Sequence, residues 1–414
     1  MKKKIVVVGA GFAGISFIQK IDFSLYDVTL IDKLNHHQFQ PLFYQVASSQ
    51  IEPSSISFPI RNIFRKIKNL HIIMSEVLQV NSEENKLICD YGTLSYDILV
   101  LALGGKTQFY NNKSIESQAF TLKSTYDAIR IRNHILELFE EINRDKNIKK
   151  AANFNFVIVG GGATGVETAG AFAEIKKFIL PKDFKEIPYD KIKIYLIEGG
   201  KSCLGNMSLK AQKYSEIYLK KLGVEIIYNE LVTDYKEDIV YLKSGSKIPS
   251  KTLIWAAGIT ANQLKGFQEE QYSGGNRLIC NRNNLVTGET NIYALGDMCY
   301  MKTPKYPKGH PQVANVAINQ AKNLAKNLNK LSLNKQLKDF EYKDLGSMAT
   351  IGKNKAVVDF SFIQLKGYIA WLIWMFLHLM LILSVRNKLV IFINWAWNYF
   401  KNDSSLRLIL KSKK

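Results

Sequence analysis

The chain has 414 residues, of which 47% are hydrophobic and 22% charged, so it is long and apolar enough for two packed domains. This composition excludes a small peptide, a collagen-like chain and an intrinsically disordered protein. Lys and Arg number 56 against 36 Asp and Glu, and the net charge of +20 admits nucleic acid, an anionic membrane or an acidic substrate as partners.

The first predicted element is a buried strand at residues 5–8, directly after three lysines. Lysines followed by an apolar run resemble the start of a signal peptide, but this run ends after four residues at the glycines of 9–14. We therefore expect a cytoplasmic chain without a leader. The glycines predict a tight turn and a helix start, and residues 26–32 predict a second strand that ends in Asp32.

The next predicted elements are a strand at 97–102, an amphipathic helix at 125–141 and a polar connection at 143–153. The first pattern then returns, because IVVVGAGFAG at 5–14 is matched by FVIVGGGATG at 156–165. The chain therefore contains an internal repeat of a strand, a glycine turn and a helix start.

The second copy of the repeat continues as the first one does. A strand at 191–198 ends in Glu198, as the strand at 26–32 ends in Asp32. This order of strand, glycine turn, helix, strand and acid is more specific than a glycine motif alone. It predicts two Rossmann-like dinucleotide-binding domains in an α/β fold.

Two further strands are predicted at 252–257 and 291–295. We expect the second dinucleotide-binding domain to be inserted in the first one. The predicted boundaries are 1–115 together with 275–360 for the first domain, 116–274 for the second, and 361–414 for a C-terminal segment.

The C-terminal segment is strongly apolar. Residues 367–385 contain no charged side chain, and as one helix they would extend about 28 Å, close to the hydrocarbon thickness of a bilayer. Residues 389–400 are too short to span and carry aromatic side chains suited to the headgroup level. We expect a helical membrane-binding segment, which either spans the membrane or lies at its interface. The alternatives are a buried dimer helix and an anchor unrelated to catalysis.

The glycine turns indicate the ligands. In such a turn the first glycine permits the bend, the second lets a pyrophosphate come close, and the third lets the helix pack on the strand. Asp32 and Glu198 would each bind a ribose diol, and Glu198 would repel a 2′-phosphate, which favours NADH over NADPH. Two dinucleotides in one chain fit a flavin and a nicotinamide. The strand that ends in Gly296 and Asp297 supports a flavin in the first domain.

Cysteine and histidine form no metal-binding pattern. The four cysteines include no C-x-x-C pair, and the six histidines include no H-x-x-x-H spacing. We therefore expect no metal ion. Residues 1–88 contain no cysteine, which argues against a disulfide reductase, and Cys280 and Cys299 are weak support for a sulfide:quinone enzyme.

Four segments give a resemblance to a known family. Residues 35–47, 160–170, 255–259 and 386–397 resemble the type II, non-proton-pumping NADH dehydrogenases, or NADH:quinone oxidoreductases, within the flavoproteins with two dinucleotide-binding domains. The resemblance covers nearly the whole chain. It implies hydride transfer from NADH to FAD and then two electrons to menaquinone or ubiquinone, at the cytoplasmic face of the cell membrane. It also makes a homodimer plausible.

The resemblance assigns residues to each ligand. FAD is expected to contact Gly9, Gly11, Gly14, Asp32, Gln45, Gly296 and Asp297. NADH is expected to contact Gly160, Gly162, Gly165, Glu198 and Gly258. Glu167 is expected close to the nicotinamide and quinone pockets as the catalytic residue, and its alternative role is a carboxylate near the start of a helix.

The expected quinone site departs from the family pattern. Where the family usually has Ala-Gln-x-Ala-x-Gln, this chain has Asn315 and Asn319, followed by Gln320. Asparagine keeps the amide but is one methylene shorter, so hydrogen bonds to a quinone carbonyl would be lost, be bridged by water or come from Gln320.

Two other functions are weighed against this one. A soluble reductase for a small iron protein would share both glycine turns but has no use for residues 367–400. A basic, nucleotide-gated binding protein rests on charge alone, since no nucleic-acid-binding motif is present. We expect no nucleic acid partner. Lys366, Arg386, Lys388 and Lys401 border the apolar pieces, so part of the charge fits a membrane surface, and the other lysines are scattered.

Overall fold

The computed structural model describes residues 2–145, 151–401, 403 and 406–410. The polar connection expected at 143–153 therefore lies partly outside the described residues. The described chain divides into two compact units. The first unit comprises residues 1–37, 58–106 and 259–344, and the second comprises 38–57, 107–258 and 345–414.

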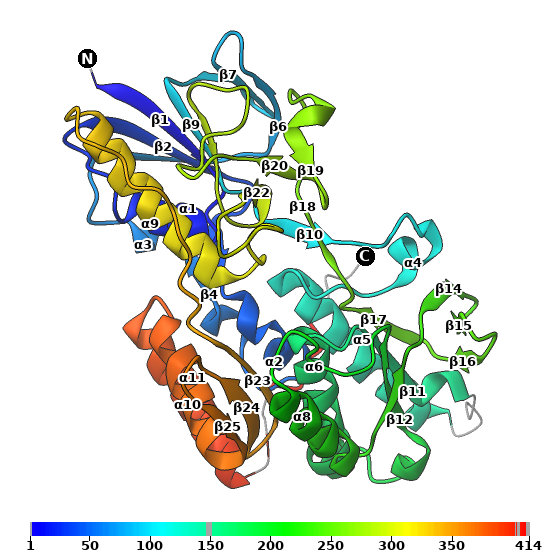
Figure 1. Ribbon diagram of the computed structural model, residues 1–414. Coiled ribbons are helices and arrows are strands. Elements are labelled where there is room, and N and C mark those ends of the chain that lie inside the picture. The colour runs from blue at the N-terminus through cyan, green and yellow to red at the C-terminus, as the bar shows by residue number, and fades with distance from the viewer. Residues whose placement is uncertain (1, 146–150, 402, 404–405, 411–414) are drawn as a thin grey trace. The chain divides into compact units, whose positions relative to one another are not determined.

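The first unit is built on a five-stranded parallel sheet in the order β21-β9-β1-β2-β5 (Figure 1). Its strands are β1 (Lys3–Val8), β2 (Tyr26–Asp32), β5 (Leu70–Met74), β9 (Ile98–Leu101) and β21 (Ile292–Ala294). An antiparallel meander, β6 (Val77–Asn81), β7 (Lys86–Cys89) and β8 (Gly92–Ser95), and the short strands β19 (Tyr272–Ser273), β20 (Arg277–Ile279) and β22 (Cys299–Tyr300) complete this unit.

Both faces of the first sheet are covered. Side chains alternate along β1, so Ile5 and Val7 pack on one face and Val6 and Val8 on the other. Helices α1 (Phe12–Ile18) and α9 (Ala314–Leu331) lie side by side on the face of Ile5 (Figure 1). A strand buried on both faces explains why its sequence is continuously apolar.

The second unit repeats this arrangement with a four-stranded parallel sheet in the order β13-β12-β11-β17. The strands are β11 (Asn155–Val159), β12 (Lys193–Glu198), β13 (Val224–Tyr228) and β17 (Thr252–Trp255). Helices α5 (Thr125–Arg144), α6 (Ala163–Glu174) and α8 (Leu209–Lys221) belong to the same unit. The fold expected from the repeat is confirmed, with strands and helices within a few residues of the predicted positions.

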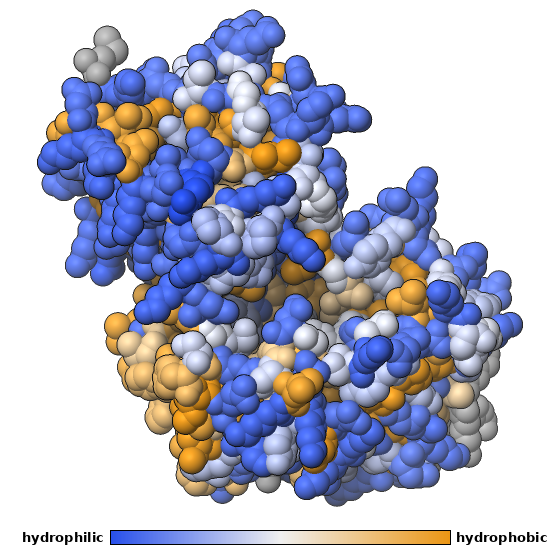
Figure 2. Space-filling view, viewed as in Figure 1, coloured by the Kyte–Doolittle hydropathy of each residue, from blue (hydrophilic) through white to orange (hydrophobic). Residues whose placement is uncertain are grey.

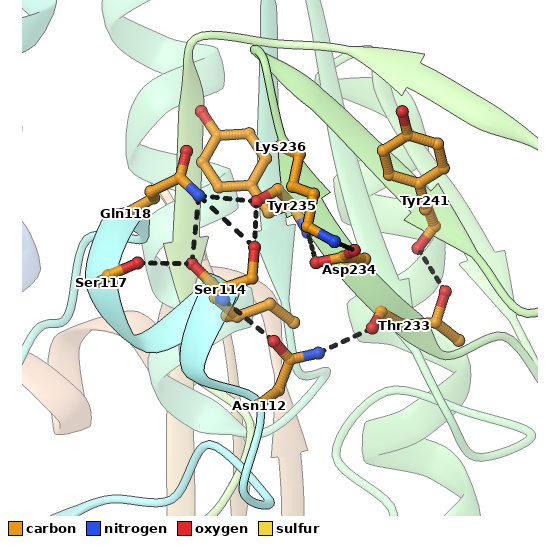
Figure 3. A network of polar contacts seen from close by, with 10 residues as sticks. Asn112, Ser114, Ser117, Gln118, Thr233, Asp234, Tyr235, Lys236 and Tyr241 are labelled. Atoms are coloured by element: carbon orange, nitrogen blue, oxygen red, sulfur yellow. Dashed lines mark hydrogen bonds and ion pairs between the residues drawn. The ribbon is translucent and has the colours of Figure 1, made fainter.

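A polar network fixes the short helix α4 (Lys113–Gln118) to an antiparallel sheet of the second unit (Figure 3). Asn112 caps the helix by accepting from the Ile115 N–H at 3.0 Å and donates to the Thr233 carbonyl at 2.6 Å. Ser114 donates to the Tyr235 carbonyl at 2.6 Å. The strands of this sheet are β14 (Val232–Lys236), β15 (Ile239–Leu242) and β16 (Lys247–Pro249).

The C-terminal part of the chain packs within the second unit instead of forming a separate segment. Strands β23 (Ser347–Gly352), β24 (Lys355–Asp359) and β25 (Gln364–Lys366) form an antiparallel sheet. Helices α10 (Gly367–Leu381) and α11 (Val385–Lys401) follow, and α10 contacts this sheet (Figure 1). The last boundary between the two units along the chain accordingly falls at residue 345. Residues 38–57 also lie in the second unit.

The apolar stretch 367–385 does not form one helix. Helix α10 ends at Leu381, and the backbone at Ile382 is extended with a buried side chain. Among the described residues, none of the helices combines the length and the apolar character needed to cross a membrane.

Candidate functional site

The first glycine turn joins β1 to α1 in the first unit. Gly9 has φ +105°, a conformation that favours glycine, and a Cβ on Gly14 would lie 1.8 Å from the Gly9 carbonyl oxygen. A residue with a side chain could replace neither glycine unless the backbone moved. A Cβ on Gly11 would meet nothing within 4 Å, so this residue faces open space at the helix start.

The acid at the end of β2 closes this turn. Asp32 accepts hydrogen bonds from the Ala10 N–H at 2.6 Å and the Leu34 N–H at 2.7 Å. Burial raises the pKa of Asp32, and these two N–H groups oppose that rise. His37 contacts the Ala10 carbonyl through Nδ1 at 2.9 Å, and burial lowers the pKa of His37 to about 4. A neutral histidine thus supports the turn, a role that the sequence analysis did not identify.

The second glycine turn joins β11 to α6 and has nearly the same geometry. Gly160 has φ +106°, and a Cβ on Gly165 would lie 1.8 Å from the Gly160 carbonyl oxygen. Gly162 again faces open space. Glu198, at the end of β12, accepts from the Gly161 N–H at 2.5 Å and the Gly200 N–H at 2.6 Å. The repeat seen in the sequence is therefore also a repeat in space.

The two turns suit two dinucleotides. Gly11 and Gly162 are the N-cap residues of α1 and α6, and neither supplies a side chain that satisfies the first N–H groups. The first N–H groups of a helix and the positive end of its dipole attract a pyrophosphate, and the open space at each N-cap glycine lets it approach. In turns of this kind, the acid beside the turn accepts hydrogen bonds from a ribose diol.

The strand β21 leads into a second part of the expected flavin site in the first unit. Gly296 has φ +63°, and its N–H donates to Gln320 Oε1 at 2.8 Å. Asp297 follows, and its carbonyl oxygen accepts from Gln312 Nε2 at 3.1 Å. Gln320 is fully buried, so its side chain holds the Gly296 backbone.

The expected quinone amides lie on α9, in the first unit. Asn319 donates from Nδ2 to the Asn315 carbonyl at 2.8 Å, and both residues are partly exposed. Gln320 points to Gly296 on the buried side of the helix. The three residues therefore do not share one environment.

Gln45 and Gly258 both lie in the second unit. Gly258 has φ +89°, and a Cβ there would lie 2.4 Å from the Tyr110 hydroxyl oxygen. Gln45, on α2 (Phe43–Ala47), donates from Nε2 to the Tyr44 hydroxyl at 2.9 Å and accepts from Trp395 Nε1 at 2.8 Å. The amide of Gln45 thus connects α2 to the C-terminal helix α11.

A pocket in the second unit brings these elements together. Its empty volume is about 750 Å³, a figure that includes the open mouth. Its walls come from α2, α6, the β23–β24 hairpin, α10 and α11. The polar or aromatic residues that matter most for its chemistry are Tyr44, Gln45, Glu167, Glu174, Lys353, Trp374, Trp395 and Tyr399.

Glu167 is the buried acid of this pocket. Only 8% of its surface is exposed, and one carboxyl oxygen accepts from the Thr350 N–H at 3.3 Å. Burial raises the pKa of Glu167 to about 8, against the smaller effects of the Thr350 N–H and the Trp374 indole, which lower it. Glu167 is therefore protonated near neutral pH and can give a proton to a bound molecule.

The remaining wall residues were not found from the sequence. Trp374 and Trp395 are 1% and 8% exposed, so these two tail aromatics face inward, while Trp397 is 57% exposed. Glu174 follows Glu167 by seven residues, a spacing that places both on one face of a helix. That spacing is the one signal that could have identified Glu174 in advance.

Comparisons with known proteins agree with this architecture. Residues 3–321 match the pyridine nucleotide-disulphide oxidoreductase family, and residues 345–402 match the NDH2 C-terminal domain. The chain is 30% identical to the type II NADH:quinone oxidoreductase Ndh of Mycobacterium tuberculosis, covering 95% of this chain and 88% of that protein. It is also 30% identical to the external NADH-ubiquinone oxidoreductase 2 of Saccharomyces cerevisiae mitochondria, covering 98% and 82%.

Solved structures give the same fold. The structure of NDH2 from Plasmodium falciparum in complex with NADH has a TM-score of 0.90 and 24% identity, covering 99% of this chain and 100% of that one. A sulfide:quinone oxidoreductase from Aquifex aeolicus is less similar, with a TM-score of 0.74 and 19% identity over 96% of this chain and 95% of that one. The resemblance found in the motifs is confirmed, and the chain belongs to the type II NADH:quinone oxidoreductases, within the pyridine nucleotide-disulphide oxidoreductase family.

Proposed function

We propose that this chain oxidises NADH through a bound FAD and reduces a quinone at a membrane, without pumping protons. FAD supplies the chemistry that links a hydride donor to an acceptor of single electrons. The observation that carries the proposal is a repeated glycine turn with a carboxylate beside each copy, in a chain of this family.

We propose the same assignment of residues to the two dinucleotides that the sequence predicts. For FAD we propose Gly9, Gly11, Gly14, Asp32, Gly296 and Asp297. For NADH we propose Gly160, Gly162, Gly165, Glu198 and Gly258. The first set lies in the first unit and the second set in the second unit. Gln45 was also expected at FAD, and its amide is engaged by Tyr44 and Trp395, so we propose it as a residue that shapes the pocket.

We propose that the pocket of the second unit receives the quinone. It offers apolar and aromatic walls for a planar, lipid-soluble ring, and Glu167 supplies a proton inside them. Reduction of a quinone to a quinol consumes two electrons and two protons, so a protonated acid beside the ring serves this reaction. Asn315, Asn319 and Gln320, the amides expected at the quinone from the sequence, lie on α9 in the first unit and are not among the residues that line this pocket. The Gln320 amide accepts from the Gly296 N–H instead.

We propose further that α10 and α11 attach the enzyme to the cytoplasmic face of the membrane. Figure 2 shows apolar side chains gathered over these helices, at the lower left of the view. Exposed members include Ile369, Leu372, Phe376, Met380, Leu389, Phe392, Ile393, Trp397 and Phe400. Lys366, Arg386 and Lys401 are exposed beside them, and each basic residue near an anionic leaflet contributes about 1 kcal/mol.

A two-step assay tests the function. The protein is purified in detergent with its flavin and mixed with NADH without oxygen, which should bleach the flavin absorbance. Addition of a menaquinone or ubiquinone analogue should then restore it. Flavin that stays oxidised with NADH contradicts the dehydrogenase activity, and reoxidation only by a small iron protein favours the soluble reductase.

Attachment and assembly need separate measurements. Binding to vesicles that contain anionic lipid, compared with neutral vesicles, tests the membrane surface. Light scattering in detergent tests the homodimer. Binding that is equal for both kinds of vesicle contradicts a role of the basic residues.

A further inference from the structure

A second carboxyl group lines the proposed quinone pocket. Glu174 ends α6, two turns after Glu167, and seven residues correspond to about 10 Å along the helix axis. Only 8% of the Glu167 surface is exposed, whereas Glu174 is partly exposed. The two acids thus line the same pocket, and Glu174 is the more accessible residue of the pair.

The β23–β24 hairpin holds both acids in place. The Thr350 N–H donates to Glu167, and the Lys353 N–H donates to Glu174 at 2.5 Å. Gly170 lies between them on α6, and a Cβ there would be 2.8 Å from the Ile351 carbonyl oxygen. The missing side chain lets the helix approach the hairpin closely enough for both hydrogen bonds.

Tyr44 connects the two acids electrostatically. Tyr44 lines the same pocket as both acids. Burial raises the pKa of the Tyr44 phenol, and the negative charges of Glu167 and Glu174 raise it further. Burial raises the pKa of Glu174 as well, while Lys353 and Lys355 oppose that rise. The titratable and charged groups around Glu174 are therefore Tyr44 on α2, Glu167 on its own helix, Lys353 and Lys355 on the hairpin, and Tyr399 on α11.

We propose that Glu174 is the proton entry residue of this pocket and recharges Glu167 during quinone reduction. This inference rests on the proposed quinone site. Glu167 gives its proton to a quinone oxygen, where an O–H bond forms while the two electrons come from NADH through FAD. The Glu167 carboxylate then regains a proton from the Glu174 carboxyl, through water or the Tyr44 hydroxyl, and Glu174 takes a proton from bulk water. Glu174 acts through Glu167 and does not itself touch the quinone.

The test separates the two half-reactions of the flavin-loaded enzyme. Glu174→Gln should leave flavin reduction by NADH within about twofold and slow flavin reoxidation by a soluble quinone analogue by about tenfold near neutral pH, a smaller loss than removal of a direct acid causes. As the pH is raised, the rate of flavin reoxidation should also begin to fall at lower pH in Glu174→Gln than in the parent enzyme. The reason is that Glu167 must then take protons directly from water. Glu216 is a partly exposed acid on α8 that pairs with Lys220, so Glu216→Gln is the matched control and should change neither rate.

Chemical rescue distinguishes proton transfer from a structural role. Glu174→Ala should regain quinone reduction when imidazole buffer is added, because its protonated form, imidazolium, is a small weak acid that can donate a proton. Glu167→Gln should not regain it. An independent readout is the infrared carbonyl absorption of protonated carboxyl groups in the oxidised enzyme, in which Glu174→Gln should remove one pH-dependent band and Glu167→Gln another.

Several results would overturn the proposal. A parent-like reoxidation rate and pH profile in Glu174→Gln would do so, as would a slow variant with an unshifted pH profile and no imidazole rescue. If Glu174→Gln does not fold, Glu174→Ala replaces it, and an unchanged rate and pH profile there refute the relay. Glu167→Gln with unimpaired quinone reduction would instead refute the proposed quinone site, so the two failures are distinguishable.

Discussion

Replacing Glu167 with glutamine should make the stability of the protein less sensitive to alkaline pH. Glutamine has the shape of a protonated glutamate and keeps an oxygen that can accept from the Thr350 N–H. It cannot ionise, however. The parent protein must either keep Glu167 protonated or pay for a buried negative charge, and the variant faces neither requirement.

The magnitude follows from the pKa of Glu167. In the folded protein the pKa is about 8 instead of the ordinary 4.5, because burial disfavours the carboxylate. In the unfolded chain the group ionises near 4.5, so the folded state loses stability as the pH rises from there to about 8. At about 1.4 kcal/mol for each pH unit, the loss is at most about 5 kcal/mol, a large part of a typical unfolding free energy.

The assay is urea unfolding of the parent and the variant at about pH 5 and about pH 9. The quantity to compare is the unfolding free energy of Glu167→Gln minus that of the parent. This difference should increase by about 2–5 kcal/mol from the lower to the higher pH. Glu216→Gln removes a surface ion pair with Lys220, whose acid is partly exposed, and the same difference should change by no more than about 1 kcal/mol. A difference for Glu167→Gln that stays constant across this pH range would refute the reasoning.

Three other substitutions test the site. Gly170→Ala places a Cβ 2.8 Å from the Ile351 carbonyl oxygen, so overpacking should outweigh the better helix propensity of alanine. The unfolding free energy measured in urea should fall by about 1–2 kcal/mol, and a more stable variant would contradict this packing. Trp395→Phe removes the donor to Gln45 Oε1 and should cost about 1–3 kcal/mol in the same measurement, whereas an unchanged midpoint would show that the amide finds another partner. Glu198→Gln removes the repulsion of a 2′-phosphate, so kcat/KM for NADPH should rise about tenfold relative to NADH; an unchanged ratio would argue against this contact.

The two dinucleotide-binding turns could be predicted because their geometry is local. Each requires glycine at three fixed positions and an acid at the end of the next strand, and all of these are near neighbours in the sequence. The structure gives Gly9 and Gly160 almost the same φ and places Asp32 and Glu198 on equivalent N–H groups. The strands were recognisable for a related reason, since burial on both faces leaves continuous apolar runs.

The C-terminal segment was less predictable because hydrophobicity alone does not say what a side chain contacts. Residues 367–385 have the composition of a single membrane helix, yet the helix ends at Leu381. Trp374 and Trp395 turn inward to the pocket, and Trp397, two residues further, is exposed. Tertiary contacts distinguish these tryptophans, since the ring centroids of Trp374 and Trp395 lie 5.9 Å apart and Trp395 donates to Gln45 on α2.

The sequence by itself therefore determined the family, the two Rossmann-like units and the residues of the glycine turns, since each depends on short-range patterns. The tertiary structure decided the pocket, whose walls come from α2, α6, the hairpin and the two C-terminal helices. Glu167 belongs to a motif, but its raised pKa arises from burial by segments far along the chain, and Glu174 joins it only because Gly170 lets α6 meet the hairpin. Burial and close approach are properties of the packed chain, and no local pattern encodes them.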